Sequence, residues 1–172
     1  MSTTPKLPRE WSDWRALPLA GDGRCLIEAS AGTGKTWTIA VLYLRLLLEC
    51  GWSPRQVVVT TFTIAAAQEL RERLRERLTR AVRQAERAAA GAAVDASSTD
   101  AGDAWLRERW SNPVTPARTD LIRLRLAQAE FDLAPITTLH SLCRKILADF
   151  PFESGSAFGT GELVSTETLD RE

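Results

Sequence analysis

The stretch that decides the fold is a glycine-bearing loop near the N-terminus, which reads Ala29-Ser30-Ala31-Gly32-Thr33-Gly34-Lys35-Thr36. It matches the phosphate-binding pattern G-x-x-x-x-G-K-[ST], except that alanine replaces the first glycine. The apolar run RCLIE at 24–28 precedes the loop and predicts a buried strand. The residues at 36–49 are apolar on several sides and predict a buried helix. Strand, loop and helix in this order form the context that a phosphate-binding loop requires.

The chemistry of this loop predicts a site for a nucleoside triphosphate and Mg²⁺, lined by the whole of 29–36. Gly32 and Gly34 allow the backbone to curl until its N–H groups point at phosphate oxygens. The helix that begins near Gly34 adds the positive end of its dipole. Lys35 is expected to reach the β- and γ-phosphates as the catalytic cation, and the Thr36 hydroxyl to ligate the metal. A glycine-rich turn with an exposed lysine is the structural alternative.

Outward from the loop, expected strands and helices alternate along the chain. They are a strand at 57–61 (VVVTT), a helix from about 64 to about 90, a loop at 91–103, a mostly helical insertion at about 104–131 broken near Asn112, Pro113 and Pro116, a strand at 135–138 (PITT) and a helix at 139–150. This alternation predicts an α/β fold, a partial parallel sheet of the P-loop NTPase kind flanked by helices.

The helix expected at about 64–90 combines an apolar stripe with many arginines. The stripe recurs every four residues, at Ala66, Leu70, Leu74, Leu78 and Val82. Between 71 and 87 there are seven arginines and three glutamates, a net charge of +4. The simplest interpretation is a solvated face, and the alternative is a surface that assists the approach of DNA.

Composition narrows the class of protein before any family is considered. The chain has 172 residues, 44% of them hydrophobic and 26% charged, which excludes a wholly disordered chain or a collagen-like repeat. The formal net charge of zero argues against a strongly basic nucleic-acid binder. The basic block at 71–87 is, however, offset by an acidic block at 151–172, so a local positive field remains.

No targeting signal is visible, so we expect a soluble, cytoplasmic protein without a membrane partner. The first residues are polar and lack an apolar core for a secretory leader. The most apolar stretch, 39–48, is much shorter than the roughly 20 residues that span a bilayer. Cys25, Cys50 and Cys143 show no paired spacing, which favours neither a disulfide framework nor a zinc site.

Three ordered blocks of sequence resemble the N-terminal region of superfamily 1 helicases of the UvrD type. They are CLIEASAGTGKTWTIAVLYLRLLLE at 25–49, VVVTTFTIAAAQELRERL at 57–74 and FDLAPITTLHSLCRKIL at 131–147. Within that group they resemble most the helicase–nuclease subunits of exonuclease V, as does FESG at 152–155. The AddA-type enzymes share the first blocks and are a near alternative. The resemblance covers roughly 17–170.

The resemblance implies a RecA-like motor domain that hydrolyses ATP, with Mg²⁺, to move along single-stranded DNA. It places three DNA contacts after the second strand, with Phe62 stacking on a base and Thr61 and Thr63 near backbone phosphates. It places two more, Thr138 and His140, after the third strand. Stacking on an aromatic ring ignores base identity, which suits a translocating enzyme. The implied role is repair and recombination at DNA ends, with exonuclease activity and RecC- and RecD-like partner subunits.

Each DNA contact also has a structural alternative that the residues alone do not exclude. Phe62 at the end of a strand is as compatible with the core as with stacking. His140 is the single histidine of the chain, and such a residue is often a structural group. Ile64 stands where relatives carry a polar residue, and no glutamine lies at 17–22, where relatives recognise adenine. The resemblance therefore assigns no residue of this chain to the recognition of the adenine base of the nucleotide.

The catalytic parts that follow the loop in such motors have no counterpart in the sequence. ATP hydrolysis requires an acidic pair after an apolar strand and an arginine donated across the cleft. Asp132, Asp149 and Asp170 each lack the preceding strand. We therefore expect an N-terminal fragment with weak or no ATPase activity by itself. It would comprise a segment at 1–20, part of the ATP-binding domain at 21–150 and the start of a further region at 151–172.

Two other functions remain open at this point. The chain could be a truncated P-loop module that binds nucleotide or DNA without turnover. It could also be a P-loop ATPase or kinase unrelated to DNA, which predicts no affinity for single strands and no effect of Phe62→Ala.

Overall fold

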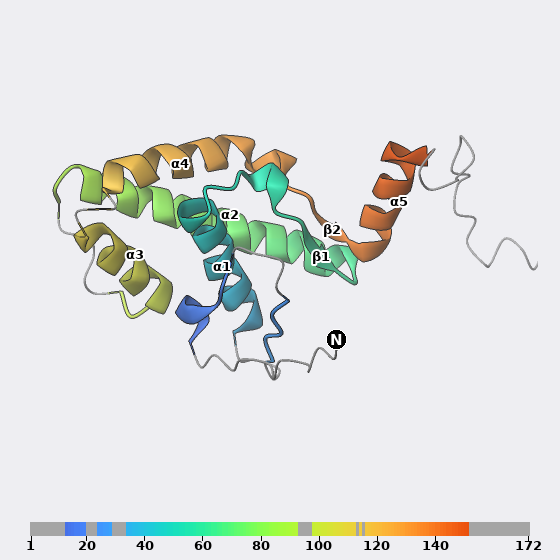
Figure 1. Cartoon of the computed structure of the whole chain (residues 1–172), viewed down its shortest axis with the longest axis horizontal. Coiled ribbons are helices and arrows are strands. Elements are labelled where there is room, and N and C mark those ends of the chain that lie inside the picture. Colours follow the sequence, from blue (N-terminus) through green and yellow to red (C-terminus); the bar gives the residue numbers. More distant parts are fainter. Residues whose placement is uncertain are drawn as a thin grey trace, which may run out of the picture.

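The computed structural model describes residues 13–19, 24–28, 34–92, 98–112, 114 and 116–151. Its elements, in chain order, are a 3-10 helix at Trp14–Ala16, α1 (Lys35–Glu49), a 3-10 helix at Pro54–Gln56, β1 (Val59–Thr61), α2 (Ile64–Ala89), α3 (Ala101–Ser111), α4 (Ala117–Glu130), a 3-10 helix at Phe131–Leu133, β2 (Ile136–Thr138) and α5 (Leu139–Asp149) (Figure 1). The described part is therefore a mixed α/β fold in which helices predominate.

The two strands of the described residues form a small parallel sheet. β1 pairs with β2 in a register that sets Val59 opposite Ile136 and Thr61 opposite Thr138. The chain crosses from one strand to the other through α2, α3 and α4, as parallel neighbours require. This confirms a parallel pair at the second and third predicted strands. β1 is shorter than the predicted 57–61, because Val57 caps a 3-10 helix and Val58 is exposed.

The strand predicted at 24–28 is wrong. These residues adopt no regular structure, and Leu26 leaves 83% of its surface exposed. A strand exists only where a neighbour accepts and donates its backbone hydrogen bonds, and the ladder here joins β1 and β2. An apolar run without such a neighbour does not become a strand, however well its composition suits one.

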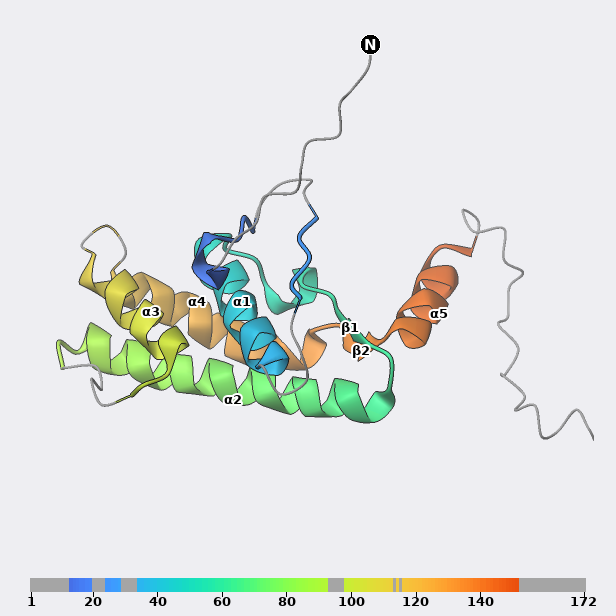
Figure 2. The same ribbon diagram turned by 90° about the horizontal axis from the view of Figure 1, so that it is seen from below.

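The core lies between the helices rather than on the sheet. α2 and α4 run alongside each other, and α1 packs across α2 and also contacts α4 (Figures 1 and 2). Leu44 and Leu48 of α1 meet Leu74 and Leu78 of α2 in one buried cluster that also includes Leu124 of α4. α1 buries residues around most of its circumference, as its sequence predicts.

The long helix predicted at about 64–90 is confirmed as α2, with one change in its buried face. Leu70, Leu74 and Leu78 are buried, but Ala67 is buried in place of the predicted Ala66. A spacing of four residues drifts around a helix that has 3.6 residues per turn, so the buried face alternates between steps of three and four. The same drift brings Arg77 onto the buried face.

The segment between α2 and β2 contains two helices separated by a break. α3 ends at Ser111 and α4 begins at Ala117, which agrees with the break predicted near Asn112 and Pro116. α3 begins three residues before the predicted position, because the Asp100 side chain accepts hydrogen bonds from the N–H groups of Gly102 and Asp103 and caps the helix.

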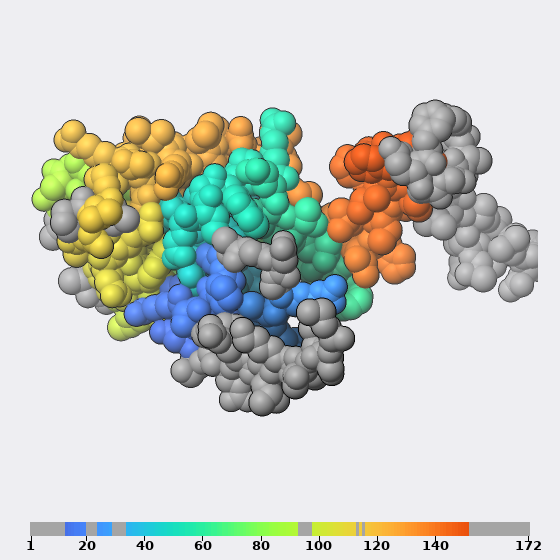
Figure 3. Space-filling model, in the orientation of Figure 1, coloured from blue at the N-terminus to red at the C-terminus, as the bar shows by residue number. Residues whose placement is uncertain are grey.

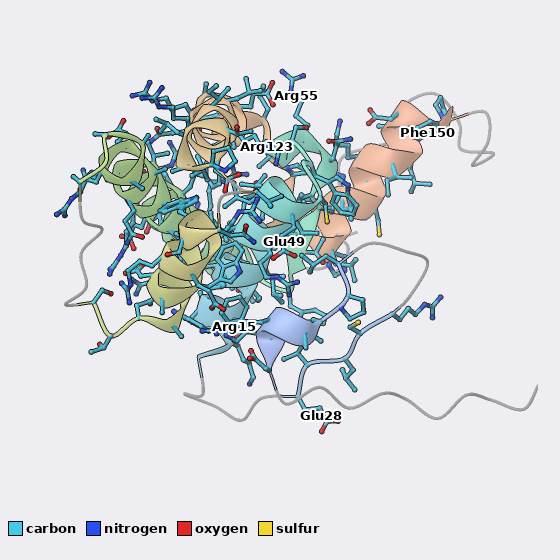
Figure 4. The ribbon with its side chains drawn as sticks, turned by 60° about the vertical axis from the view of Figure 1, so that its left-hand side comes forward. Arg15, Glu28, Glu49, Arg55, Arg123 and Phe150 are labelled. Atoms are coloured by element: carbon cyan, nitrogen blue, oxygen red, sulfur yellow. The ribbon has the colours of Figure 1, made fainter. Side chains whose placement is uncertain are left out.

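α5 projects from one end of the molecule and contacts β1 and β2 (Figure 3). None of its residues is buried, and apolar side chains such as Ile146 and Phe150 are exposed. Figure 4 shows Phe150 at the far end of α5, away from the helical body. Among the described residues, no helix has the length and apolar character that crossing a bilayer would require.

Candidate nucleotide and nucleic-acid sites

Gly34, the second glycine of the predicted loop, has a left-handed backbone conformation that suits the motif. Residues Ala29 to Thr33 lie outside the described part of the chain, so Gly34, Lys35 and Thr36 represent the loop. Gly34 caps α1 with φ of 85°, a left-handed conformation that glycine adopts without strain. Its carbonyl accepts hydrogen bonds from the Thr38 backbone N–H at 2.8 Å and the Thr38 hydroxyl at 3.2 Å.

Lys35 and Thr36 lie in the first turn of α1, where a phosphate group would be bound. Lys35 is exposed and Thr36 is partly buried. The first N–H groups of a helix have no partner within it, and the dipole makes this end positive. An ammonium group, a hydroxyl and free N–H groups are the donor set that suits a triphosphate with Mg²⁺. The described residues therefore fit the group that the motif predicts.

The turn after the loop is attached to the rest of the molecule by Trp37. Its indole Nε1 donates to Asp100 Oδ2 at 2.8 Å, and the Arg77 guanidinium lies 5.8 Å from its ring centre. The Trp14 ring packs edge-on against it at 5.8 Å. The prediction of a solvated face on α2 is thus wrong for Arg77, which is 8% exposed. The burial of Arg77 could have been predicted from its position between Leu74 and Leu78 on the apolar side of α2.

A second group of predicted site residues gathers at the carboxyl ends of the two strands. The register sets Thr61 directly opposite Thr138, so the residues that follow each strand leave the sheet at the same edge. Phe62 follows β1 with 87% of its surface exposed, which rules out the core position that its residue type allowed. His140, in the first turn of α5, is also exposed.

The hydroxyl groups of three predicted DNA contacts are engaged within the chain. Thr61 Oγ1 donates to the Thr63 carbonyl at 2.9 Å. Thr63 Oγ1 accepts from the Ala66 N–H at 3.2 Å and so caps α2. Thr138 Oγ1 accepts from the Ser141 N–H at 3.2 Å and caps α5. Two capped helix N-termini therefore begin at the same edge of the sheet.

We define the strand-end surface as Phe62, Thr63, Ile64, Leu139 and His140. Phe62, Ile64 and Leu139 are exposed apolar side chains on this surface. Phe62 directly follows β1, and Ile64 and Leu139 are the first residues of α2 and α5. An exposed aromatic ring beside two positive helix ends is an arrangement that can stack a base and face a phosphate.

The carboxylates considered for metal binding lie apart from strand ends. Asp132 lies in a 3-10 helix and pairs with Arg75 of α2 at 2.5 Å. Asp149 ends α5 and pairs with Lys145 at 2.9 Å. Asp170 lies outside the described residues. Neither described carboxylate therefore extends toward the first turn of α1 from a neighbouring strand.

Comparison with known proteins identifies the family. The UvrD/REP helicase N-terminal domain matches residues 12–169. The RecBCD enzyme subunit RecB of Escherichia coli (strain K12) is 38% identical over 171 residues, covering 90% of this chain and 12% of that protein. RecB of Haemophilus influenzae is 39% identical over 150 residues, with 83% and 12% covered. RecB of Buchnera aphidicola subsp. Schizaphis graminum is 51% identical over 169 residues, with 89% and 12% covered.

These relatives bear out the predicted resemblance to the helicase–nuclease branch. The chain spans 12% of the length of each of the three proteins. The family match covers both the predicted loop at 29–36 and the strand-end surface. The chain belongs to the UvrD/REP helicase N-terminal domain family, in which it is a RecB-like member.

Proposed function

We propose that this chain is the ATP- and DNA-binding N-terminal part of a RecB-like helicase. The observation that carries the proposal is the strand-end surface, where an exposed Phe62 lies beside two helix N-termini. In this arrangement Phe62 stacks on a base and the exposed His140 side chain faces the backbone of a single strand. Thr61, Thr63 and the buried Thr138 act through the helix starts that they shape, because their own hydroxyls are engaged within the chain. Contacts of this kind bind nucleic acid without regard to sequence.

The nucleotide site of the proposal is the loop at 29–36, at the start of a P-loop, RecA-like domain. Gly34 supports it through a left-handed conformation at the N-terminus of α1. Lys35 would neutralise the β- and γ-phosphates, and Thr36 would hold Mg²⁺. The bound Mg²⁺–ATP would supply the energy of phosphoryl transfer, and this chain would bind and orient the phosphates. The proposed division of the chain remains 1–20, 21–150 and 151–172.

The wider role follows from the relatives, whose name places RecB in a RecBCD enzyme. We propose that the whole protein processes DNA ends in the cytoplasm as a helicase and exonuclease in repair and recombination. RecC- and RecD-like subunits are its proposed partners. For the 172 residues alone we expect binding with weak or no ATP hydrolysis, because Asp132 and Asp149 lie away from the first turn of α1 on other elements.

The nucleotide site is tested with Lys35→Ala and a fluorescent ATP analogue in the presence of Mg²⁺. Loss of the ammonium group removes a charge-assisted contact, and we expect affinity to fall about tenfold or more. Arg55→Ala is the matched control, because Arg55 is an exposed cation on a separate 3-10 helix and points outward in Figure 4. Equal binding by wild type and Lys35→Ala would remove the nucleotide site from the proposal.

The DNA surface is tested with Phe62→Ala and the fluorescence anisotropy of a labelled single strand. A stacked base is worth about 1–3 kcal/mol, so affinity should fall about fivefold or more, equally for different sequences. Ile122→Ala is the control, since Ile122 is an exposed apolar residue of α4 outside the strand-end surface. Unchanged binding in Phe62→Ala would remove stacking on Phe62 from the proposal, and no binding of the strand by wild type would favour a nucleotide-binding protein unrelated to DNA.

A further inference from the structure

We propose that Asp100 is a positioning residue that couples the nucleotide site to the strand-end surface through Trp37 and Arg77. The inference rests on the proposed function, because it connects the two binding sites that the function requires. It concerns a residue outside both sites, in the segment between α2 and α3. The alternative is a purely structural role, in which Asp100 caps α3 and nothing more.

Asp100 joins three elements through a single carboxylate. Its Oδ2 accepts a hydrogen bond from Trp37 Nε1 of α1 at 2.8 Å. Its Oδ1 accepts from Arg77 Nη2 of α2 at 2.6 Å. The same Oδ1 also caps α3, accepting from the N–H groups of Gly102 at 2.8 Å and Asp103 at 3.0 Å. Movement of α1 relative to α2 must therefore strain or break contacts at this carboxylate.

Arg77 holds the other side of this junction. Its guanidinium pairs with Asp103 Oδ1 at 3.2 Å as well as with Asp100, and it lies over the Trp37 ring. Asp103 is 1% exposed and also pairs with Arg80. A buried carboxylate that loses a cationic partner is left uncompensated, so the arrangement resists displacement. α2 is thereby tied to the first turn of α1 at Arg77, in its interior.

The opposite end of α1 is also held by the chain between α2 and β2. Arg109 of α3 donates to the Leu48 carbonyl at 3.1 Å, and Arg123 of α4 donates to the same carbonyl at 3.0 Å. With its C-terminal end fixed in this way, α1 can respond to a bound phosphate mainly at its first turn. Trp37, two residues after Lys35, transmits that response to Asp100.

α2 carries the response to the DNA surface. It is one helix of 26 residues that begins at Ile64, directly after Phe62 and Thr63. A continuous helix moves as a rigid element, so a change at Arg77 reaches the strand-end surface without a separate relay.

Hydrogen bonds from Arg77 and Trp37 outweigh the effect of burial and lower the pKa of Asp100 to about 2, which keeps the carboxylate charged during function.

The experiment measures the coupling between nucleotide and DNA in the full chain. The dissociation constant of a labelled single strand is measured with and without a non-hydrolysable ATP analogue and Mg²⁺, and their ratio is the coupling factor. In wild type we expect a factor of about fivefold or more. In Asp100→Asn, whose amide cannot accept from both donors, the factor should fall close to one while each ligand alone still binds.

Two further variants separate positioning from structure. Trp37→Phe keeps an aromatic ring over Arg77 but removes the indole N–H that Asp100 accepts, so it should also lose the coupling. If Asp100→Asn does not fold, the coupling factor of Trp37→Phe tests the inference instead. Asp132→Asn is the matched control, because it removes the carboxylate partner of Arg75 on the same helix at an exposed position. Asp132→Asn should retain the wild-type coupling factor.

The outcomes distinguish the inference from the function on which it rests. If wild type binds both ligands with coupling and folded Asp100→Asn and Trp37→Phe retain it, Asp100 has only a structural role. If wild type binds both ligands independently, the inference is overturned while the proposed function stands. If wild type binds neither ligand, the proposed function fails and the inference fails with it.

Discussion

Gly34 is the residue on which the geometry of the nucleotide loop depends. Its φ of 85° lies in the left-handed region, and an added Cβ would find space, with Trp37 Cβ at 3.9 Å as its nearest neighbour. The cost of a side chain at this position is therefore conformational rather than steric. Gly51, which follows α1, has a similar φ of 69° and nothing within 4 Å of an added Cβ. The two glycines form a natural pair for comparison.

Gly34→Ala should lower the free energy of unfolding by about 1–2 kcal/mol, because an L-residue is strained in the left-handed region. It should also weaken nucleotide binding, because relief of the strain moves the N–H groups of the loop. Gly51→Ala should cost similar stability and leave nucleotide binding unchanged. Thermal unfolding and fluorescent-nucleotide titration measure the two effects. Equal nucleotide affinity in both variants would contradict a special role for Gly34.

Tyr43 of α1 is a residue whose buried hydroxyl group affects stability. Its hydroxyl is buried and has no hydrogen-bond partner among the residues that the structure describes. Burial, opposed by the charge of Arg71, raises the pKa of Tyr43 to about 12. Tyr43→Phe removes an unsatisfied polar group while the ring keeps its edge-on contact with Phe131. The variant should therefore match wild type or gain up to about 1 kcal/mol in urea unfolding, and a loss would contradict this.

At the scale of elements, the two helices that follow the strands begin in the same way. Thr63 caps α2 and Thr138 caps α5, each through a side-chain oxygen that accepts a backbone N–H three residues later. Thr63 lies two residues after the end of β1 and Thr138 is itself the last residue of β2, so each strand end and helix start form one unit. This unit explains why the predicted DNA contacts include residues whose hydroxyls are engaged internally. What they present outward is the positive end of a helix.

Thr63→Ala should lower the free energy of unfolding by about 1 kcal/mol, because the N–H of Ala66 loses its acceptor. Thr63→Ser keeps the oxygen and should behave like wild type. Chemical denaturation of both variants measures the difference. If Thr63→Ser is destabilised as much as Thr63→Ala, the methyl group rather than the cap is the important part.

At the scale of the whole molecule, ion pairs between distant segments hold the helical layers together. Asp103 and Asp120 are buried carboxylates of α3 and α4, paired with Arg77 of α2 and Arg109 of α3 respectively. Arg45 of α1 donates to the Trp14 and Leu17 carbonyls, which fastens the N-terminal 3-10 helix. Removing one partner of such a pair leaves an uncompensated charge. Polar contacts as well as apolar packing therefore define how these elements are arranged.

The ion pair of Asp100 with Arg77 predicts a loss of stability in acid. The pKa of Asp100 is about 2 in the folded chain against an ordinary value of 3.8. A lowered pKa contributes stability that is fully present above the ordinary value and disappears as the pH falls through about 2. The difference in urea midpoint between wild type and Asp100→Asn should therefore shrink between about pH 4 and pH 2.

Asp132→Asn is again the control, because the exposed pair of Asp132 with Arg75 contributes little at any pH. Its midpoint should follow that of wild type throughout the titration. A difference between wild type and Asp100→Asn that is as large at pH 2 as at pH 7 would show that the ionised carboxylate is not the source.

The sequence by itself determined the elements whose signals are local. The spacing of Leu70, Leu74 and Leu78 predicted α2, and the Gly-Lys-Thr run predicted where α1 begins. The β-branched runs predicted both strands, because they suit a pleated, paired backbone. The family blocks predicted which residues after each strand form a candidate site. Helix spacing and capping depend on residues a few positions apart, which is why the predictions of α1, α2 and the two strands were confirmed, while the site residues stay a prediction.

Only the tertiary structure decided which residues lie together. The run at 24–28 had the composition of a strand but no neighbour in the ladder. Phe62 is exposed, although its residue type suited the core as well as the surface. Arg77 is buried, although an arginine is usually exposed. The contact of Asp100 with Trp37 joins positions 63 residues apart. The exposure of Phe62 and the ion pairs of Asp100 and Arg77 depend on packing between distant segments, and no pattern along the chain records that packing.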